Sequence, residues 1–123
     1  MHIHAQNEGD QMIAANRTRH ATLKARTRTH RAAAKIRRTG TGTLATHCLA
    51  AGLAPREART VAGSLRKNAE KAGVTGTPSV SYTHGRARQC TRYTPAEVAR
   101  IAVIYRPRKP AYRTAAARLA LAA

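Results

Sequence analysis

The stretch TLATHCLAAGLAPREARTVAGSLRKNAEKAG, residues 43–73, carries the strongest structural signal of this chain. It predicts a short helix, a tight turn at Gly52 and a longer helix that starts at Pro55. The expected bounds are residues 43–51 for the first helix, 52–54 for the turn and 55–72 for the second helix. Gly52 stands where a helix ends in a left-handed residue, and Pro55 occupies a first-turn position that needs no N–H. This order is typical of a helix-turn-helix.

The second helix separates apolar from basic residues. At 100° per residue, one stripe collects Ala58, Val61, Ala62, Leu65, Ala69 and Ala72. The opposite face and its flanks carry Arg56, Arg59, Thr60, Gly63, Arg66, Lys67 and Lys71. The stripe would hold the helix on its domain while the basic face projects toward phosphates and base edges, and Gly63 would let a backbone approach closely. The alternative is a solvated amphipathic helix with a basic outer face.

The charge of the whole chain favours a polyanionic partner. It has 23 Lys and Arg against 5 Asp and Glu, a formal net charge of +18. A compact domain with this charge repels itself, so nucleic acid is the first candidate, and an acidic protein or an anionic membrane surface is the second. The chain has no Trp or Phe and only 4 Tyr, which argues against single-strand binding by base stacking.

No membrane span or secretion signal is expected. No apolar run approaches the roughly 18 residues of a transmembrane helix, and the start MHIHAQNEGDQ lacks the layout of a signal peptide. The two cysteines, Cys48 and Cys90, are too few for a disulfide framework. We therefore expect a reduced protein in the cytoplasm.

The N-terminal part changes character along its length. Residues 1–16 are polar and hold two of the acids, whereas residues 17–38 are rich in Lys and Arg and hold no acid. We expect residues 1–31 to form a flexible basic arm, with helix only toward residues 32–38, where Ala32, Ala33 and Ile36 make an apolar face. Its phosphate contacts would come from Arg26, Arg28 and Arg31. A disordered, solvated tail is the alternative.

A β-hairpin is expected directly after the second helix. Residues 79–83 and 88–93 are rich in Ser, Thr, Val and Tyr and flank a glycine-containing turn at residues 84–87. This is the position of a wing, with His84, Arg86 and Arg88 at its tip to contact DNA backbone. The alternative is a structural hairpin that covers the core.

The C-terminal part starts with a capping box. In Thr94-Pro95-Ala96-Glu97, Thr94 caps, Pro95 takes the first helical position and Glu97 bonds back to the cap. The helix should run to about residue 105 and bury its apolar residues in the core. Residues 106–123 are expected to form a basic linker and a short helix that packs Leu119 and Leu121 on the domain or on a second copy; the alternative is an end that frays.

The sequence offers no convincing catalytic, metal or cofactor site. Glu57, Glu70 and Glu97 are dispersed along the chain, and Glu97 is used in capping. A zinc site from His47, Cys48, His84 and Cys90 has adjacent ligands and no C-x-x-C pair. We therefore expect a protein that is not an enzyme and needs no metal or cofactor.

The order of these elements resembles a winged helix-turn-helix domain over residues 32–105, mainly α with a small β-hairpin. The likeness rests on GLAP, the amphipathic second helix and the hairpin, whereas His47 stands where an apolar residue is usual. The runs REARTVAGSLRKNAEKAGVTG, CTRY and VARIAVIYRPRKPAYR also look like small basic proteins of actinobacterial phages. The resemblance implies a phage or mobile-element DNA-binding protein that acts inside a bacterial host.

Three functions compete at this point. The first is a double-stranded DNA-binding protein, a nucleoid-associated transcriptional regulator with the second helix in the major groove. The second is a host-takeover factor that docks on an acidic or nucleic-acid-binding host protein. The third is a structural RNA-binding protein. A homodimer that reads two half-sites is compatible with the first.

Overall fold

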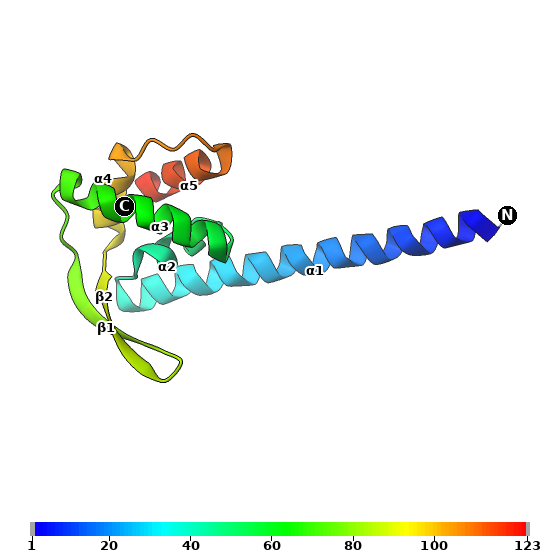
Figure 1. The fold of residues 1–123 in the computed structure, drawn as a ribbon, viewed down its shortest axis with the longest axis horizontal. Coiled ribbons are helices and arrows are strands. Elements are labelled where there is room, and N and C mark those ends of the chain that lie inside the picture. The colour runs from blue at the N-terminus through cyan, green and yellow to red at the C-terminus, as the bar shows by residue number, and fades with distance from the viewer. Residues whose placement is uncertain (1, 123) are drawn as a thin grey trace.

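The computed structural model describes the backbone of residues 2–122 and the side chains of residues 9–122. In chain order the elements are α1 (His2–Thr39), α2 (Leu44–Ala50), α3 (Pro55–Ala72), β1 (Thr77–Thr83), β2 (Arg86–Arg92), α4 (Pro95–Ile104) and α5 (Pro110–Leu121). The expected class, mainly α with a small antiparallel hairpin, is confirmed (Figure 1). Among the described residues, no helix combines the length and apolar character needed to cross a membrane.

The two helices predicted from residues 43–73 form as expected. The Thr43 side chain caps α2 by accepting a hydrogen bond of 3.3 Å from the Thr46 backbone N–H. Gly52 in the turn has φ +100°, and Gly73 ends α3 in the left-handed region at φ +70°. Pro55 opens α3. Local sequence chemistry therefore sets both ends of the α2–α3 unit.

The core lies between α2, α3, α4 and α5. The buried residues of α3 are Ala58, Val61, Ala62, Leu65 and Ala69, which confirms the predicted apolar stripe. Against them pack Cys48 of α2 and Val98 and Ile101 of α4. The Thr94–Glu97 capping box that starts α4 is present with both hydrogen bonds, at 3.0 and 3.2 Å. The small side chains of α3 let the neighbouring helices approach closely.

Helix α5 is part of this body rather than a loose tail. Ala115, Ala116 and Leu119 are buried against it, whereas Leu121 is 85% exposed, so the expectation that Leu121 packs on the domain is wrong. From α5 the Arg118 guanidinium donates a hydrogen bond of 2.9 Å to the Ala51 carbonyl oxygen at the end of α2. This bond ties the last helix to the turn between α2 and α3.

The N-terminal region differs from its expected conformation. Residues 1–31 were expected to lack regular structure, but α1 is a continuous helix of 38 residues from His2 to Thr39. Its many Ala, Arg and Lys residues favour helix. The interspersed Thr residues are accommodated within the helix, where Thr18, Thr22 and Thr27 each donate a hydrogen bond to the carbonyl oxygen four residues earlier.

Only the C-terminal end of α1 joins the body. Ala32 and Ile36 are buried against α2, which confirms the expected apolar face, whereas Met12 and Leu23 are 67% and 59% exposed. The helix is about 57 Å long at 1.5 Å per residue. Figure 1 shows its N-terminal part extending away from the other helices. The basic segment is thus displayed along a helix that the body holds at one end.

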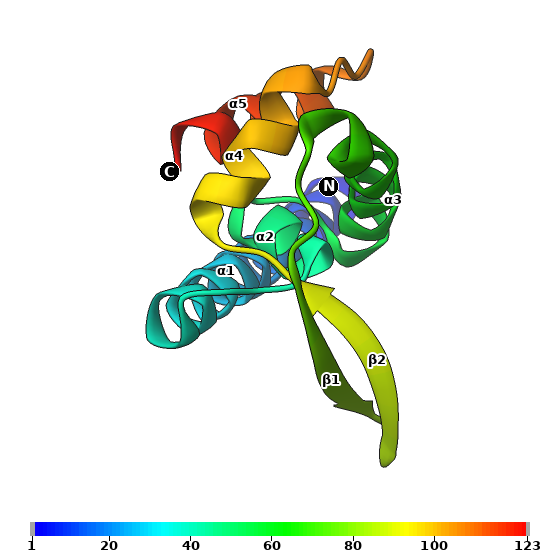
Figure 2. The same ribbon diagram turned by 90° about the vertical axis from the view of Figure 1, so that its left-hand side faces the viewer.

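The hairpin turns more tightly than its sequence suggested. Thr83 pairs with Arg86, so the loop is the dipeptide His84-Gly85 rather than residues 84–87. His84 and Gly85 have φ of +52° and +73°. Positive φ at both positions marks the turn that best matches the right-handed twist of paired strands. The two strands protrude from the helical body (Figure 2).

A small hydrogen-bonded junction fixes the base of the hairpin, and we call it the hairpin joint: Thr41, Gly42, His47, Arg92 and Tyr93. Gly42 and Tyr93 exchange backbone hydrogen bonds of 3.0 and 2.8 Å. Arg92 donates to the Thr41 hydroxyl and carbonyl oxygens at 2.9 and 2.8 Å. The joint holds the hairpin on the segment that links α1 to α2.

Candidate nucleic-acid interface

The polar face of α3 is turned outward. Because the apolar stripe is buried, Arg56, Arg59, Thr60, Arg66, Lys67 and Lys71 are all exposed, and Gly63 is half-buried. A Cβ added at Gly63 would meet no heavy atom within 4 Å, so the backbone there borders open space. The structure thus gathers every predicted α3 residue on one solvent-facing surface.

The hairpin has one basic and one apolar face. In its register Thr83 stands opposite Arg86 and Ser81 opposite Arg88, so these four side chains share a face. The other face carries Val80 and Tyr82, which are 53% and 80% exposed. Hydroxyl and guanidinium groups on one face suit phosphate oxygens, which are acceptors only. His84, at the turn, is exposed as expected.

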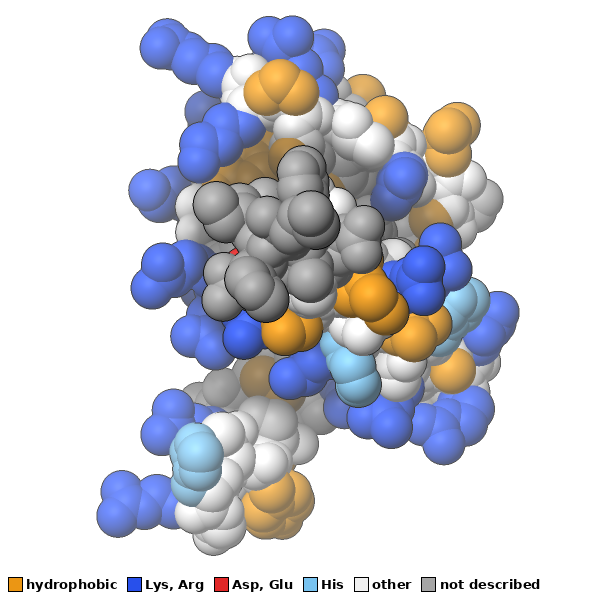
Figure 3. Space-filling model, turned by 90° about the vertical axis from the view of Figure 1, so that its right-hand side faces the viewer, with side chains coloured by type: hydrophobic (Ala, Val, Ile, Leu, Met, Phe, Trp, Pro, Cys, Tyr) orange, Lys and Arg blue, Asp and Glu red, His pale blue; other side chains and the backbone are white. Residues whose placement is uncertain are grey.

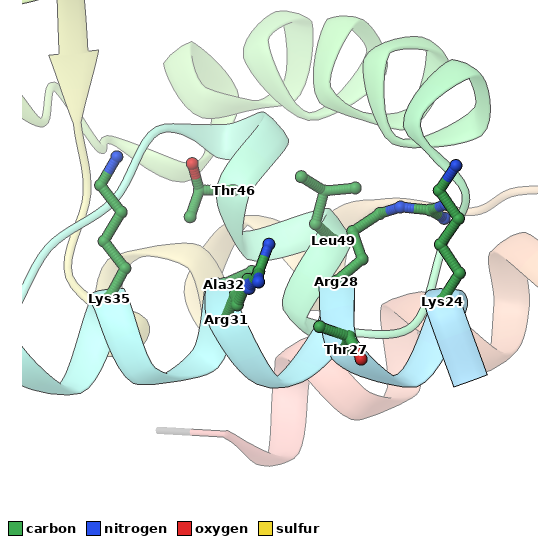
Figure 4. Close-up of a pocket in the computed structure, with 8 residues that line it drawn as sticks. All are labelled: Lys24, Thr27, Arg28, Arg31, Ala32, Lys35, Thr46 and Leu49. Atoms are coloured by element: carbon green, nitrogen blue, oxygen red, sulfur yellow. The ribbon is translucent and has the colours of Figure 1, made fainter.

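The α1 residues proposed for phosphate contact separate into two groups. Arg28 and Arg31 line a groove of about 500 Å³ between α1 and α2, and Arg26 is not among its lining residues. Side chains two residues apart on a helix are rotated by about 200° about its axis, so Arg26 points away from Arg28. We call this hollow the α1 groove; its lining residues are Lys24, Thr27, Arg28, Arg31, Ala32, Lys35, Thr46 and Leu49 (Figure 4).

Three lysines that lie near these surfaces were not among the site residues predicted from the sequence. Lys24 and Lys35 join Arg28 and Arg31 in the α1 groove, a grouping that helical spacing of three and four would have revealed had α1 been expected as a helix. Lys109 lines a separate hollow of about 560 Å³ beside Arg56 and Thr60 of α3. No pattern in the sequence could have shown this, because α3 and α5 meet only through the fold.

Positive charge dominates the surface. Figure 3 shows Lys and Arg side chains along the left edge of the molecule, from the helical body down to the hairpin. The described side chains include only the acids Asp10, Glu57, Glu70 and Glu97, and Glu97 is engaged in its capping box. The cationic groups therefore have few neutralising partners in the chain itself, and an external polyanion would relieve their repulsion.

The zinc site considered from the sequence is not assembled by the described cysteines and histidines. In the described part of the chain, no three His, Cys, Asp or Glu side chains come together as a metal site. Cys48 is fully buried, and burial raises the pKa of its thiol to about 12. A protonated, enclosed thiol is neither a nucleophile nor a ligand at neutral pH.

His47 is a structural residue of the hairpin joint. It is 3% exposed, and its Nε2 lies 2.8 Å from the Tyr93 carbonyl oxygen, to which the neutral ring donates. Burial is the main cause that holds its pKa below the ordinary 6.5, and the nearby Arg92 charge lowers it further. The unexpected polar residue in α2 thus packs inside the fold with its hydrogen bond satisfied.

Acidification below the ordinary His pKa of 6.5 is therefore expected to destabilise the fold through His47. Above that pH both the folded and the unfolded chain hold a neutral ring; below it only the unfolded chain readily gains the proton. Each unit by which the pKa is lowered corresponds to about 1.4 kcal/mol of stability lost. Urea unfolding between about pH 5 and 8 measures the effect.

The control for this prediction is His47→Gln, whose amide can donate to the Tyr93 carbonyl but does not titrate. Its stability should depend less on pH over the same range. An unchanged pH dependence in His47→Gln would assign the acid sensitivity to other groups.

Comparisons with protein-family models, with curated proteins and with solved structures found no match for this chain.

Proposed function

We propose that this protein binds double-stranded DNA through a winged helix-turn-helix-like domain. The observation that carries the proposal is the exposed face of α3, the second helix of the α2–α3 pair, which is lined by guanidinium, ammonium and hydroxyl groups. The major groove, about 12 Å wide, admits an α-helix. Arg56, Arg59, Thr60 and Lys67 enter the groove, while Arg66 and Lys71 on the flanks meet phosphates.

The hairpin supports the same assignment. It follows α3 directly, and the hairpin joint fixes its base beside the helix-turn-helix. As a wing, it would place Arg86, Arg88 and His84 on the DNA backbone next to the groove that α3 enters. Backbone contacts fix the register of a protein on the duplex, and base contacts supply its sequence preference.

The proposed role is regulation of transcription by a phage or mobile element inside a bacterial cell, with the protein associated with the nucleoid. A host-takeover factor that docks on a host protein and a structural RNA-binding protein are the competing functions. A complex from host lysate that survives nuclease treatment would favour the first of these, and a preference for A-form RNA would favour the second.

A fluorescence-anisotropy titration against a pooled duplex library, followed by sequencing of the bound fraction, tests the proposal. An enriched motif is the expected result, and its symmetry would distinguish a monomer from a dimer. Tight binding without enrichment would instead indicate a protein that coats DNA regardless of sequence. No binding would overturn the proposal.

Gly63→Ala is expected to raise stability and lower DNA affinity at the same time. An alanine inside a helix gains about 0.5–1 kcal/mol over glycine, and the added Cβ meets nothing in the free protein. On the bound face the methyl group would hold the DNA away from the α3 backbone. Urea unfolding and anisotropy measure the two effects.

Gly9→Ala is the matched control, because the same substitution in α1 also meets nothing within 4 Å. Its DNA affinity should equal that of the unmodified protein. If Gly63→Ala also kept full affinity, DNA would not approach α3 at this residue.

A further inference from the structure

The α1 groove is built from cations at helical spacing. Lys24, Arg28, Arg31 and Lys35 are separated by steps of four, three and four residues, so they form one stripe along α1. At 1.5 Å per residue this stripe is about 16 Å long. Figure 4 shows Lys24 and Lys35 projecting from α1 on the side where α2 and α3 lie. The four charges thus face a shared hollow.

Apolar residues lie beneath the basic side chains of the α1 groove. Buried Ala32 and half-buried Leu49 form an apolar floor, and Arg28 itself is half-buried between α1 and α2. Long basic side chains commonly rest their aliphatic stems on such a floor while the charged heads stay in solvent. Thr46 adds a hydroxyl from α2 to the same groove. The contact between α1 and α2 therefore holds the stripe in place.

This arrangement lacks an internal counter-charge. None of the residues that line the groove is acidic. Like charges three or four residues apart on a helix repel each other and destabilise it. A linear anion with several charges that lies along the stripe would relieve this repulsion. Duplex DNA is such an anion, because each of its strands carries one negative charge per nucleotide, about every 3.4 Å along the helix axis.

We propose that the α1 groove holds the sugar-phosphate backbone of duplex DNA, independently of sequence and in addition to the contacts of α3 and the hairpin. This inference rests on the proposed DNA-binding function. It assigns contacts to Lys24 and Lys35 and removes Arg26 from the set. Because backbone contacts carry no sequence information, the groove strengthens binding to every duplex equally.

The test compares two double variants with the same loss of charge. Arg28→Gln with Arg31→Gln removes two groove cations, whereas Arg26→Gln with Arg37→Gln removes two exposed cations of α1 that do not line the groove. Affinity for the selected and for a random duplex is measured over a range of salt. The slope of log affinity against log salt is negative, and each lost phosphate contact reduces its magnitude by about 0.9.

For the groove variant we expect the magnitude of the salt slope to fall by about 1.8 on both duplexes. For the control variant we expect an unchanged slope. Lys24→Gln with Lys35→Gln, both exposed, should reproduce the groove result without touching half-buried Arg28. Circular dichroism confirms that all variants are folded.

Other outcomes separate the two proposals. If the unmodified protein binds tightly and both variants lose the same slope, the proposal that the α1 groove holds the DNA backbone would be wrong. The proposal that the protein binds DNA would still stand. No binding to any duplex DNA by the unmodified protein would overturn both. A groove effect seen only with duplex RNA of the same sequence would overturn the DNA assignment.

Discussion

Leu65→Ala is expected to lower the free energy of unfolding by about 2–5 kcal/mol. Leu65 is fully buried at the middle of the α3 stripe and belongs to the same core as Val61, Val98 and Ile101. Removing its side chain leaves a cavity that these neighbours can fill only in part. Folded domains are stable by only about 5–15 kcal/mol, so the variant should be partly unfolded at modest urea concentrations.

The measurement is urea unfolding followed by circular dichroism, with Leu121→Ala as the matched control. Leu121 is 85% exposed, so the same substitution there should change stability by no more than about 0.5 kcal/mol. Equal effects at Leu65 and Leu121 would mean that α3 does not bury this stripe. The inference that the basic face of α3 points toward solvent would then have no basis, because it depends on the burial of this stripe.

The elements that the sequence predicted well are those with strong local chemistry. Gly52, Pro55 and Gly73 mark the ends of α2 and α3, and the Thr94–Glu97 capping box marks the start of α4. At these positions glycine, proline and side-chain caps determine the backbone directly. The apolar stripe of α3 was equally clear because its spacing fits a helix and no other regular structure.

The elements that the sequence predicted poorly depend on weaker or more distant effects. Helix α1 has no apolar stripe over most of its length, so periodicity could not reveal it, although its Ala and Arg content favours helix. The tight turn at His84-Gly85 requires a non-glycine residue, His84, at positive φ, and no pattern in the sequence indicates this. The environment of His47 depends on Tyr93, which is 46 residues away.

The same distinction explains the candidate site. The α3 face follows from a single helical wheel, so all of its residues were found together. The α1 groove needs α1 to be a helix and α2 to lie against it, so the sequence did not group Lys24 and Lys35 with Arg28 and Arg31, whereas it did group Arg26, which does not line the groove. Prediction of such a surface fails when the backbone that spaces the charges is itself assigned incorrectly.

Replacing both Arg59 and Lys67 by alanine is expected to reduce discrimination between DNA sequences. Both side chains are exposed on α3, and neither is among the residues that line the α1 groove. A side chain that reads a base edge contributes about 1–3 kcal/mol of discrimination, which is roughly a fivefold to 150-fold change in relative affinity. Affinity for random duplex should fall much less.

The measurement is the ratio of affinities for the selected and the random duplex at one fixed salt concentration, because phosphate contacts depend on salt. Arg100→Ala with Arg108→Ala is the control, since it removes the same charge from exposed positions on α4 and on the linker before α5. Its ratio should stay unchanged. If the α3 variant weakened binding to both duplexes by the same factor, Arg59 and Lys67 would contact phosphates only. The sequence preference would then have to arise elsewhere on the protein or from the shape of the DNA.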